Sequence, residues 1–178
     1  GPEDAHSSND ALEGLVERLK QKMEQNPNDG VGWGLLARSY VGLGRYGEAV
    51  AIYEKAVGLR PDDAQLLADY ADTLGVVNGR KLEGKPEVLI QQALKIDPRN
   101  VKALMLSGTV AFNRRNFAQA VQDWEGARAN LPQDMDPEMT QQLMAAIAEA
   151  QSQLGGGQKA MPAFAEASAP VRPTGQTG

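Results

Sequence analysis

The sequence predicts an all-α protein built from repeated pairs of antiparallel helices. Four prolines lie in similar polar settings, at Pro27, Pro61, Pro98 and Pro132, with spacings of 34, 37 and 34 residues. Between them, apolar residues recur at the three- and four-residue intervals of a helix with one buried face. A fixed period of this length indicates stacked structural repeats, each burying its apolar face against the next.

The side chains between the prolines match the 34-residue tetratricopeptide pattern. The first repeat fills all eight diagnostic positions: Trp33, Leu36, Ala37, Tyr40, Ala49, Tyr53, Ala56 and Pro61. The third fills six of them, and the second fits once a three-residue insertion is allowed. Small residues stand where two helices must approach closely, and the proline ends each second helix because it has no N–H to continue the ladder. We therefore predict an all-α tetratricopeptide-repeat superhelix, with three repeats and flanking N- and C-terminal helices.

The order of the elements follows from this period. We expect residues 1–8 to be linker residues, because the opening Gly1-Pro2 is typical of a protease-cleavage scar. The tetratricopeptide-repeat domain is predicted at 9–154, beginning with a helix whose apolar residues lie before Pro27. Its parts are repeats at about 30–63, 64–100 and 101–134 and a C-terminal cap helix at 137–154. Three glycines then end the cap helix, and 155–178, rich in Gly, Ala and Pro, is predicted to be a flexible tail.

The composition excludes several classes of function. The chain has no cysteine and a single histidine, His6, in a polar N-terminal stretch, so Cys/His zinc sites and Ser-His triads are not expected. The net charge of −5 argues against nucleic acid as a partner. No apolar run reaches the ~20 residues that cross a bilayer, so we expect no membrane contact by this segment itself. We predict a protein that is not an enzyme, with no catalytic residue, metal or cofactor.

The insertion in the second repeat contains a near match to a phosphate-binding loop. Residues 79–86 read Gly-Arg-Lys-Leu-Glu-Gly-Lys-Pro, with the glycines and the lysine correctly spaced. The last position is Pro86, which has neither a hydroxyl for Mg²⁺ nor an N–H for phosphate, and the preceding segment is predicted to be a helix rather than a strand. We interpret this segment as a widened turn of the second repeat.

The repeat register predicts which side chains line a concave peptide-binding groove. The second, fifth, ninth and twelfth residues of each first helix lie on one helix face. The residues that this register selects include both apolar and charged side chains. A surface of this kind suits an amphipathic helix, with Met105 as an adaptable apolar contact. The predicted groove residues are Val31, Gly34, Arg38, Val41, Gln65, Ala68, Asp72, Lys102, Met105, Thr109 and Phe112.

Several segments between Leu12 and Leu154 resemble the periplasmic region of the CcmI (CycH) family of bacterial cytochrome c maturation. The most specific of them is the Asn-Gly-Arg-x-Leu-x-Gly-x-Pro insertion at 78–86, which generic tetratricopeptide repeats lack. Further support comes from the run at 67–72 and the segment at 93–98.

This resemblance implies a periplasmic chaperone module of an inner-membrane-anchored protein. Such a module binds apocytochrome c, mainly through the client's C-terminal helix, and presents it to the haem ligation complex. No individual binding residue is carried over from the family, and the groove residues come from the repeat register alone. The alternative is a protein-binding repeat scaffold of another bacterial envelope assembly complex.

Overall fold

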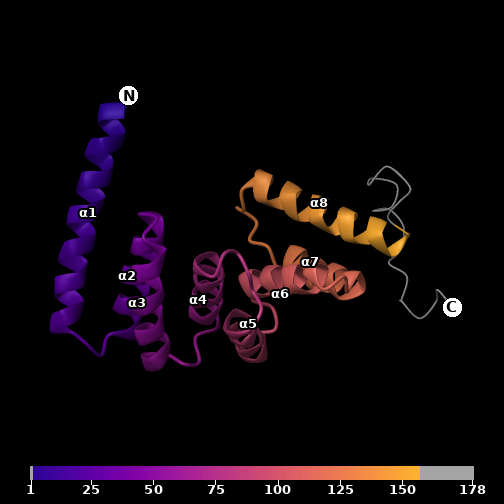
Figure 1. Ribbon diagram of the computed structural model, residues 1–178, viewed down its shortest axis with the longest axis horizontal. Helices are drawn as coiled ribbons and strands as arrows, with labels where there is room; N and C mark the ends of the chain where they lie inside the picture. The colour runs from indigo at the N-terminus through magenta and orange to yellow at the C-terminus, as the bar shows by residue number, and fades with distance from the viewer. Residues whose placement is uncertain (1, 157–178) are drawn as a thin grey trace. The chain divides into compact units, whose positions relative to one another are not determined.

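The computed structural model describes residues 2–156, which form eight α-helices and no strand (Figure 1). The all-α prediction is confirmed. Four of the helices end two or three residues before one of the repeat prolines, as expected for a residue that cannot continue a helix. In chain order the helices are α1 (Pro2–Gln25), α2 (Gly30–Gly42), α3 (Tyr46–Leu59), α4 (Ala64–Val77), α5 (Lys85–Ile96), α6 (Val101–Asn113), α7 (Phe117–Ala129) and α8 (Pro137–Leu154).

The first helix of each repeat starts at a side-chain cap two residues after the proline. Asp29, Asp63 and Asn100 accept hydrogen bonds from the backbone N–H three residues further on, at 2.9–3.0 Å. An Asp or Asn at this position satisfies an N–H that has no partner inside the helix. The polar residue after each proline therefore sets where the next helix begins.

The described chain divides into two compact units, and each is described by itself. Unit 1 runs to Leu89 and unit 2 begins at Ile90, so the division falls within α5. Residues 157–178, which hold most of the predicted tail, lie outside the described residues.

In unit 1, α2 packs on α3, and α3 packs on α4. The pattern residues of the first repeat, except the exposed Pro61, form its core, with Leu36, Ala37, Ala49 and Ala56 completely buried. The ring of Tyr53 stacks on that of Tyr70 with centroids 6.1 Å apart. Small residues thus bring the helices together, and aromatic rings fill the space between them.

Helix α1 packs on α2 and begins earlier than the sequence suggested. Val16 and Met23 are buried, whereas Leu15, on the same apolar stretch, is 55% exposed. Residues 2–8, expected to be linker residues, belong to this helix, and Glu3, Asp4 and residues 6–10 are exposed. The buried half of α1 is therefore its C-terminal half, next to α2.

In unit 2, α6 packs on α7 and α7 on α8. The core includes Trp124 from α7 and Leu143 and Ile147 from α8. The indole Nε1 of Trp124 donates to the carbonyl oxygen of Met105 at 3.0 Å, which joins α7 to α6. One side of α8 thus completes the apolar core of the last helix pair.

Candidate peptide-binding surface

The predicted groove residues fall on α2 and α4 in unit 1 and on α6 in unit 2. The two sets are described separately. Within each set the side chains differ in solvent exposure, because neighbouring helices cover some of them and leave others open to solvent.

On α2 the exposed face consists of Val31, Leu35 and Arg38. Val31 is 61% exposed, Leu35 48%, and the Arg38 side chain 51%. Their spacing of four and three residues places them in one line along the helix. Leu35 was not among the predicted groove residues, because the register selects Gly34 beside it. Gly34 is buried, and a Cβ placed on it would lie 3.1 Å from Cδ1 of Leu66.

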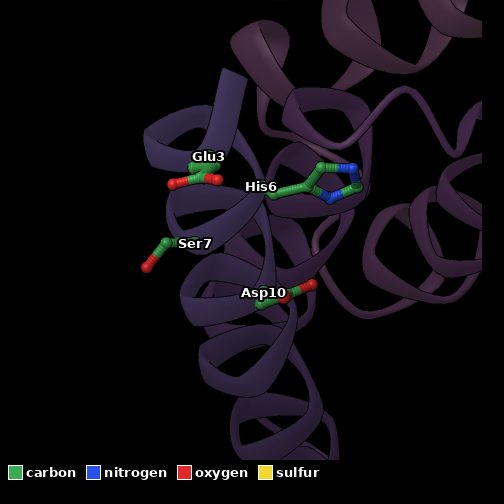
Figure 2. Close-up of a pocket in the computed structure, with 4 residues that line it drawn as sticks. All are labelled: Glu3, His6, Ser7 and Asp10. Carbon is green, nitrogen blue, oxygen red and sulfur yellow. The ribbon is translucent and has the colours of Figure 1, made fainter. Parts of the chain in front are cut away.

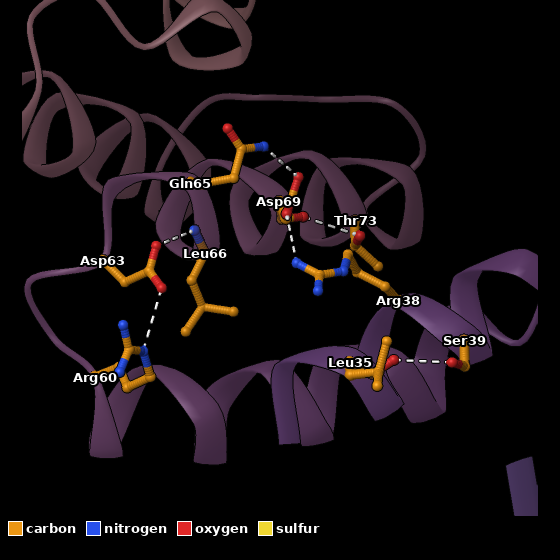
Figure 3. Close-up of polar contacts among 9 residues, drawn as sticks. All are labelled: Leu35, Arg38, Ser39, Arg60, Asp63, Gln65, Leu66, Asp69 and Thr73. Atoms are coloured by element: carbon orange, nitrogen blue, oxygen red, sulfur yellow. Dashed lines mark hydrogen bonds and ion pairs between the residues drawn. The ribbon is translucent and has the colours of Figure 1, made fainter. Parts of the chain in front are cut away.

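Opposite Arg38, helix α4 contains a buried carboxylate, that of Asp69. Asp69 is only 6% exposed; Gln65 Nε2 donates to its Oδ1 at 3.1 Å, and Arg38 Nη1 lies 3.9 Å from its Oδ2 (Figure 3). The Thr73 hydroxyl donates to the Asp69 backbone carbonyl at 3.0 Å. The carboxylate of Asp69 therefore orients the guanidinium of Arg38, which remains half exposed.

Asp69 was missed because the periodicity that marks a helix face does not distinguish a buried aspartate from an exposed one. The available signal was the four-residue spacing between Gln65 and Asp69, which favours a side-chain hydrogen bond on one helix face. Of the remaining predicted residues on these helices, Val41 and Asp72 are partly exposed, whereas Ala68 is completely buried and offers no side-chain surface.

The same carboxylate influences a buried tyrosine on α3. Burial raises the pKa of the Tyr53 hydroxyl, and the negative charge of Asp69 raises this pKa further. Arg38 acts in the opposite direction because its positive charge favours the phenolate. Tyr53 is therefore neutral at physiological pH and belongs to the core.

In unit 2 the four predicted residues on α6 are Lys102, Met105, Thr109 and Phe112, and all are partly exposed. Thr109 is turned back to the helix, because its hydroxyl donates to the Met105 carbonyl at 3.1 Å. The Phe112 ring packs against the rings of Trp124 and Phe117, with centroids 5.7 and 5.1 Å away. Phe112 is thus both part of the surface and part of the core.

A hollow beside α1 is lined by Glu3, His6, Ser7 and Asp10 (Figure 2). All four come from one helix, and their side chains spread from it without converging on a common point (Figure 2). Nowhere in residues 2–156 do three or more His, Cys, Asp or Glu side chains come together as a metal site would require. Within that range, too, no helix is sufficiently long and apolar to span a membrane.

Comparison with known proteins identifies the family. The model of the "Cytochrome c-type biogenesis protein H TPR domain" family matches residues 1–139. The chain is 31% identical over 127 residues to the cytochrome c-type biogenesis protein CycH of Pseudomonas aeruginosa, covering 71% of this chain and 31% of CycH.

A second relative and a solved structure extend this finding. The formate-dependent nitrite reductase complex subunit NrfG of Escherichia coli O157:H7 is 30% identical over 113 residues, covering 64% of this chain and 57% of NrfG. The crystal structure of the MamA protein superposes with a TM-score of 0.69 at 16% identity, covering 96% of this chain and 93% of MamA, which supports the fold alone.

The chain spans about a third of the length of CycH and just over half that of NrfG. The predicted resemblance is confirmed by the family match, which covers well over half of this chain. The chain therefore belongs to the cytochrome c-type biogenesis protein H family of tetratricopeptide-repeat domains, and this membership supports a role in cytochrome c maturation.

Proposed function

We propose that this domain is a non-catalytic, periplasmic chaperone module that binds apocytochrome c, mainly the C-terminal helix of the client, and delivers it to the haem ligation complex. Membership of the family supports a role in cytochrome c maturation. The exposed face of α2 supports binding of a helical segment of the client. Val31 and Leu35 provide two apolar contacts one turn apart, and Arg38 follows them. An amphipathic helix with apolar residues at the same spacing would cover this line.

The predicted groove residues form the proposed contacts, one set in each unit, with two refinements. Leu35 joins them, because it is exposed between Val31 and Arg38. Gly34 and Ala68 support the surface from beneath, because both are buried. On α6, Lys102 and Met105 are the proposed contacts, with Thr109 and Phe112 at the same face.

A second candidate function is a repeat scaffold of another envelope assembly complex. The observation in its favour is the similarity to NrfG, of which the chain covers a larger share than of CycH. The client of such a scaffold would differ, whereas the binding surface would be the same.

The test is a calorimetric titration with two peptides, one from the C-terminal helix of an apocytochrome c and one of scrambled sequence. We expect selective binding, with helicity gained by the bound peptide in circular dichroism. The variant V31S/L35S should weaken binding about tenfold, because it removes two apolar contacts. Met105→Ala should weaken it less, since one flexible side chain is shortened.

Val88→Ser is the matched control, because Val88 is 56% exposed on α5 outside the proposed surface. Phe112→Ala is not used, since it also removes ring contacts with Trp124. Equal binding of both peptides would contradict the proposed client. Unchanged binding by V31S/L35S would contradict the proposed surface.

A further inference from the structure

The insertion of the second repeat forms a loop at 78–84 that starts from the same helix-ending turn as the other repeats. The backbone N–H of Arg45, Arg80 and Asn116 each donates to the carbonyl five residues earlier, at 2.8–2.9 Å. In the first and third repeats the next helix begins at the following residue, whereas four more residues separate Arg80 from α5. The insertion therefore extends the chain after an otherwise ordinary turn.

Packing against α4 holds this loop in place. Leu82 lies on Gly75, where a Cβ would come within 2.7 Å of Leu82 Cδ2, so a larger residue at 75 would displace the loop. Pro86, at the start of α5, is fully buried. The Lys85 ammonium lies 5.3 Å from the centre of the Tyr70 ring. These contacts come from the middle of the segment and from the residues directly after it, and they hold the loop in a defined shape.

The backbone of the loop is unusual. Gly79 and Gly84 have φ of 75° and 82°, and between them Arg80 has φ of 66°. Residues other than Gly, and to a lesser extent Asn and Asp, rarely adopt this left-handed conformation, because the Cβ approaches the backbone. A strained arginine held by its surroundings is a feature that often accompanies binding sites.

The cations of this loop differ from those of the other two turns. Arg45 pairs with Glu48, with its Nε 2.7 Å from Oε1, and also lies over the Tyr40 ring. Arg115, also left-handed at φ 63°, lies over the Phe117 ring. Arg80 and Lys81 are exposed and form no ion pair or ring contact within residues 2–156.

We propose that loop 78–84 is a second interaction surface, which binds an acidic segment of a partner polypeptide through Arg80 and Lys81. The surface lies on the insertion, apart from the exposed stripe of α2, and does not depend on the client proposed above. Because the backbone is already fixed, an acidic segment would pair with both cations without having to order the loop. The chain as a whole is acidic, at −5, so attraction of an anionic peptide must come from a local group of cations.

An acidic polypeptide fits this loop better than an anionic membrane does. Membrane-binding basic segments usually contain about four to eight Lys or Arg residues without intervening acids. Here only Arg80, Lys81 and Lys85 are basic, and Glu83 and Glu87 lie among them. A few cations interspersed with carboxylates favour a partner polypeptide whose acidic side chains are spaced along its sequence.

The test uses a fluorescent, end-blocked peptide of alternating glutamate and alanine, and the same peptide with glutamine in place of glutamate. Fluorescence polarisation should show binding of the glutamate peptide only, weakening as salt is raised. The variant R80Q/K81Q should lose about tenfold in affinity, as expected for two exposed ion pairs. The control K95Q/R99Q removes the same charge from exposed positions in unit 2 and should bind as the unchanged protein does.

The variant Leu82→Ala tests whether the fixed shape of the loop contributes to affinity in addition to its charges, because this variant keeps every charged group. We expect a loss of several-fold in affinity, with circular dichroism unchanged, since the loop must then be ordered on binding. The proposal is overturned if the glutamate peptide does not bind, or if R80Q/K81Q binds it as well as K95Q/R99Q does. It is also overturned, in favour of a membrane, if vesicles containing phosphatidylglycerol bind through Arg80 and Lys81 more tightly than the peptide does.

Discussion

Equivalent positions in the helix pairs α2–α3 and α6–α7 hold different residues that complete the core in different ways. In unit 1 these are Ala37 on α2 and Tyr53 on α3, both buried. In unit 2 they are Gly108 on α6 and Trp124 on α7. A Cβ on Gly108 would overlap Trp124 Nε1. The larger ring in unit 2 is therefore accommodated by the loss of a methyl group on the facing helix.

The neighbouring positions differ in polarity. Unit 1 has Leu36, completely buried, and Ile52. The equivalent residues in unit 2 are Ser107 and Asp123, and the Ser107 hydroxyl donates to Asp123 Oδ2 at 2.7 Å. Both residues of the first pair are apolar, whereas a directional hydrogen bond joins the second pair. The repeat register thus specifies where the helices meet, while the chemistry of the contact varies.

The largest expected effect is that of Gly108→Ala. The added methyl group would displace the Trp124 ring and its bond to the Met105 carbonyl, lowering the free energy of unfolding of unit 2 by about 2–3 kcal/mol. Urea unfolding followed by fluorescence in the Trp33→Phe background reports on unit 2, because Trp124 is then the one remaining tryptophan of the chain. The control is Gly126→Ala, where a Cβ meets only ordinary contacts 3.5 Å away. Equal stability of the two variants would contradict the tight contact.

Asp123→Ala should have the next largest effect, about 1–3 kcal/mol on the same unfolding transition. It leaves the partly buried Ser107 hydroxyl without its acceptor and also removes the hydrogen bond from the exposed Gln119 amide. The double variant S107L/D123I gives unit 2 the two apolar residues that unit 1 has at the equivalent positions. We expect it to be markedly more stable than Asp123→Ala, because the Ser107 hydroxyl and the Asp123 carboxylate are removed together. A double variant as unstable as the single one would show that unit 2 cannot accept the apolar contact.

A smaller effect, specific to unit 1, appears at alkaline pH. Because burial raises the pKa of Tyr53, the folded state keeps its proton above pH ~10, where the unfolded state loses it. Stability should therefore decrease as the pH rises above this value, and Tyr53→Phe should reduce the decrease. Thermal unfolding between pH 8 and 11 measures this, with the exposed Tyr46→Phe as control. The same decrease in both variants would contradict the assignment to Tyr53.

The smallest expected effect is that of Glu48→Gln, which gives α3 the residue that α7 has at Gln119. The hydrogen bond from Arg45 lowers the pKa of Glu48, so the pair stabilises the fold above the ordinary glutamate pKa and is lost as the pH falls through the lowered value. Both side chains are exposed, so the change in melting temperature at neutral pH should be slight. The variant should also lose less stability between neutral pH and pH 3 than the unchanged protein does. A large drop at neutral pH would indicate a structural role that exposure does not suggest.

Much of the fold could be predicted because helix ends and close contacts have local signatures. Helices end shortly before the repeat prolines, and the next helices begin at Asp or Asn caps shortly after them. Both signals can be recognised in short segments of the sequence. The candidate surface was less predictable. The register selected Arg38 and Met105, but it missed the exposed Leu35 and included the buried Ala68. Helical periodicity defines a face to within about one residue, whereas exposure depends on which neighbour covers that residue.

The all-α class, the repeat period and the widened turn in the second repeat follow from the amino-acid sequence alone, since propensity, capping and spacing are properties of short segments. Tertiary structure alone decided three other features. It buried Asp69 beside Arg38, placed Leu82 on Gly75, and left Arg80 and Lys81 exposed at the surface. The reason is that burial and pairing arise when helices distant in sequence come together, and no local pattern records which side chain then covers which.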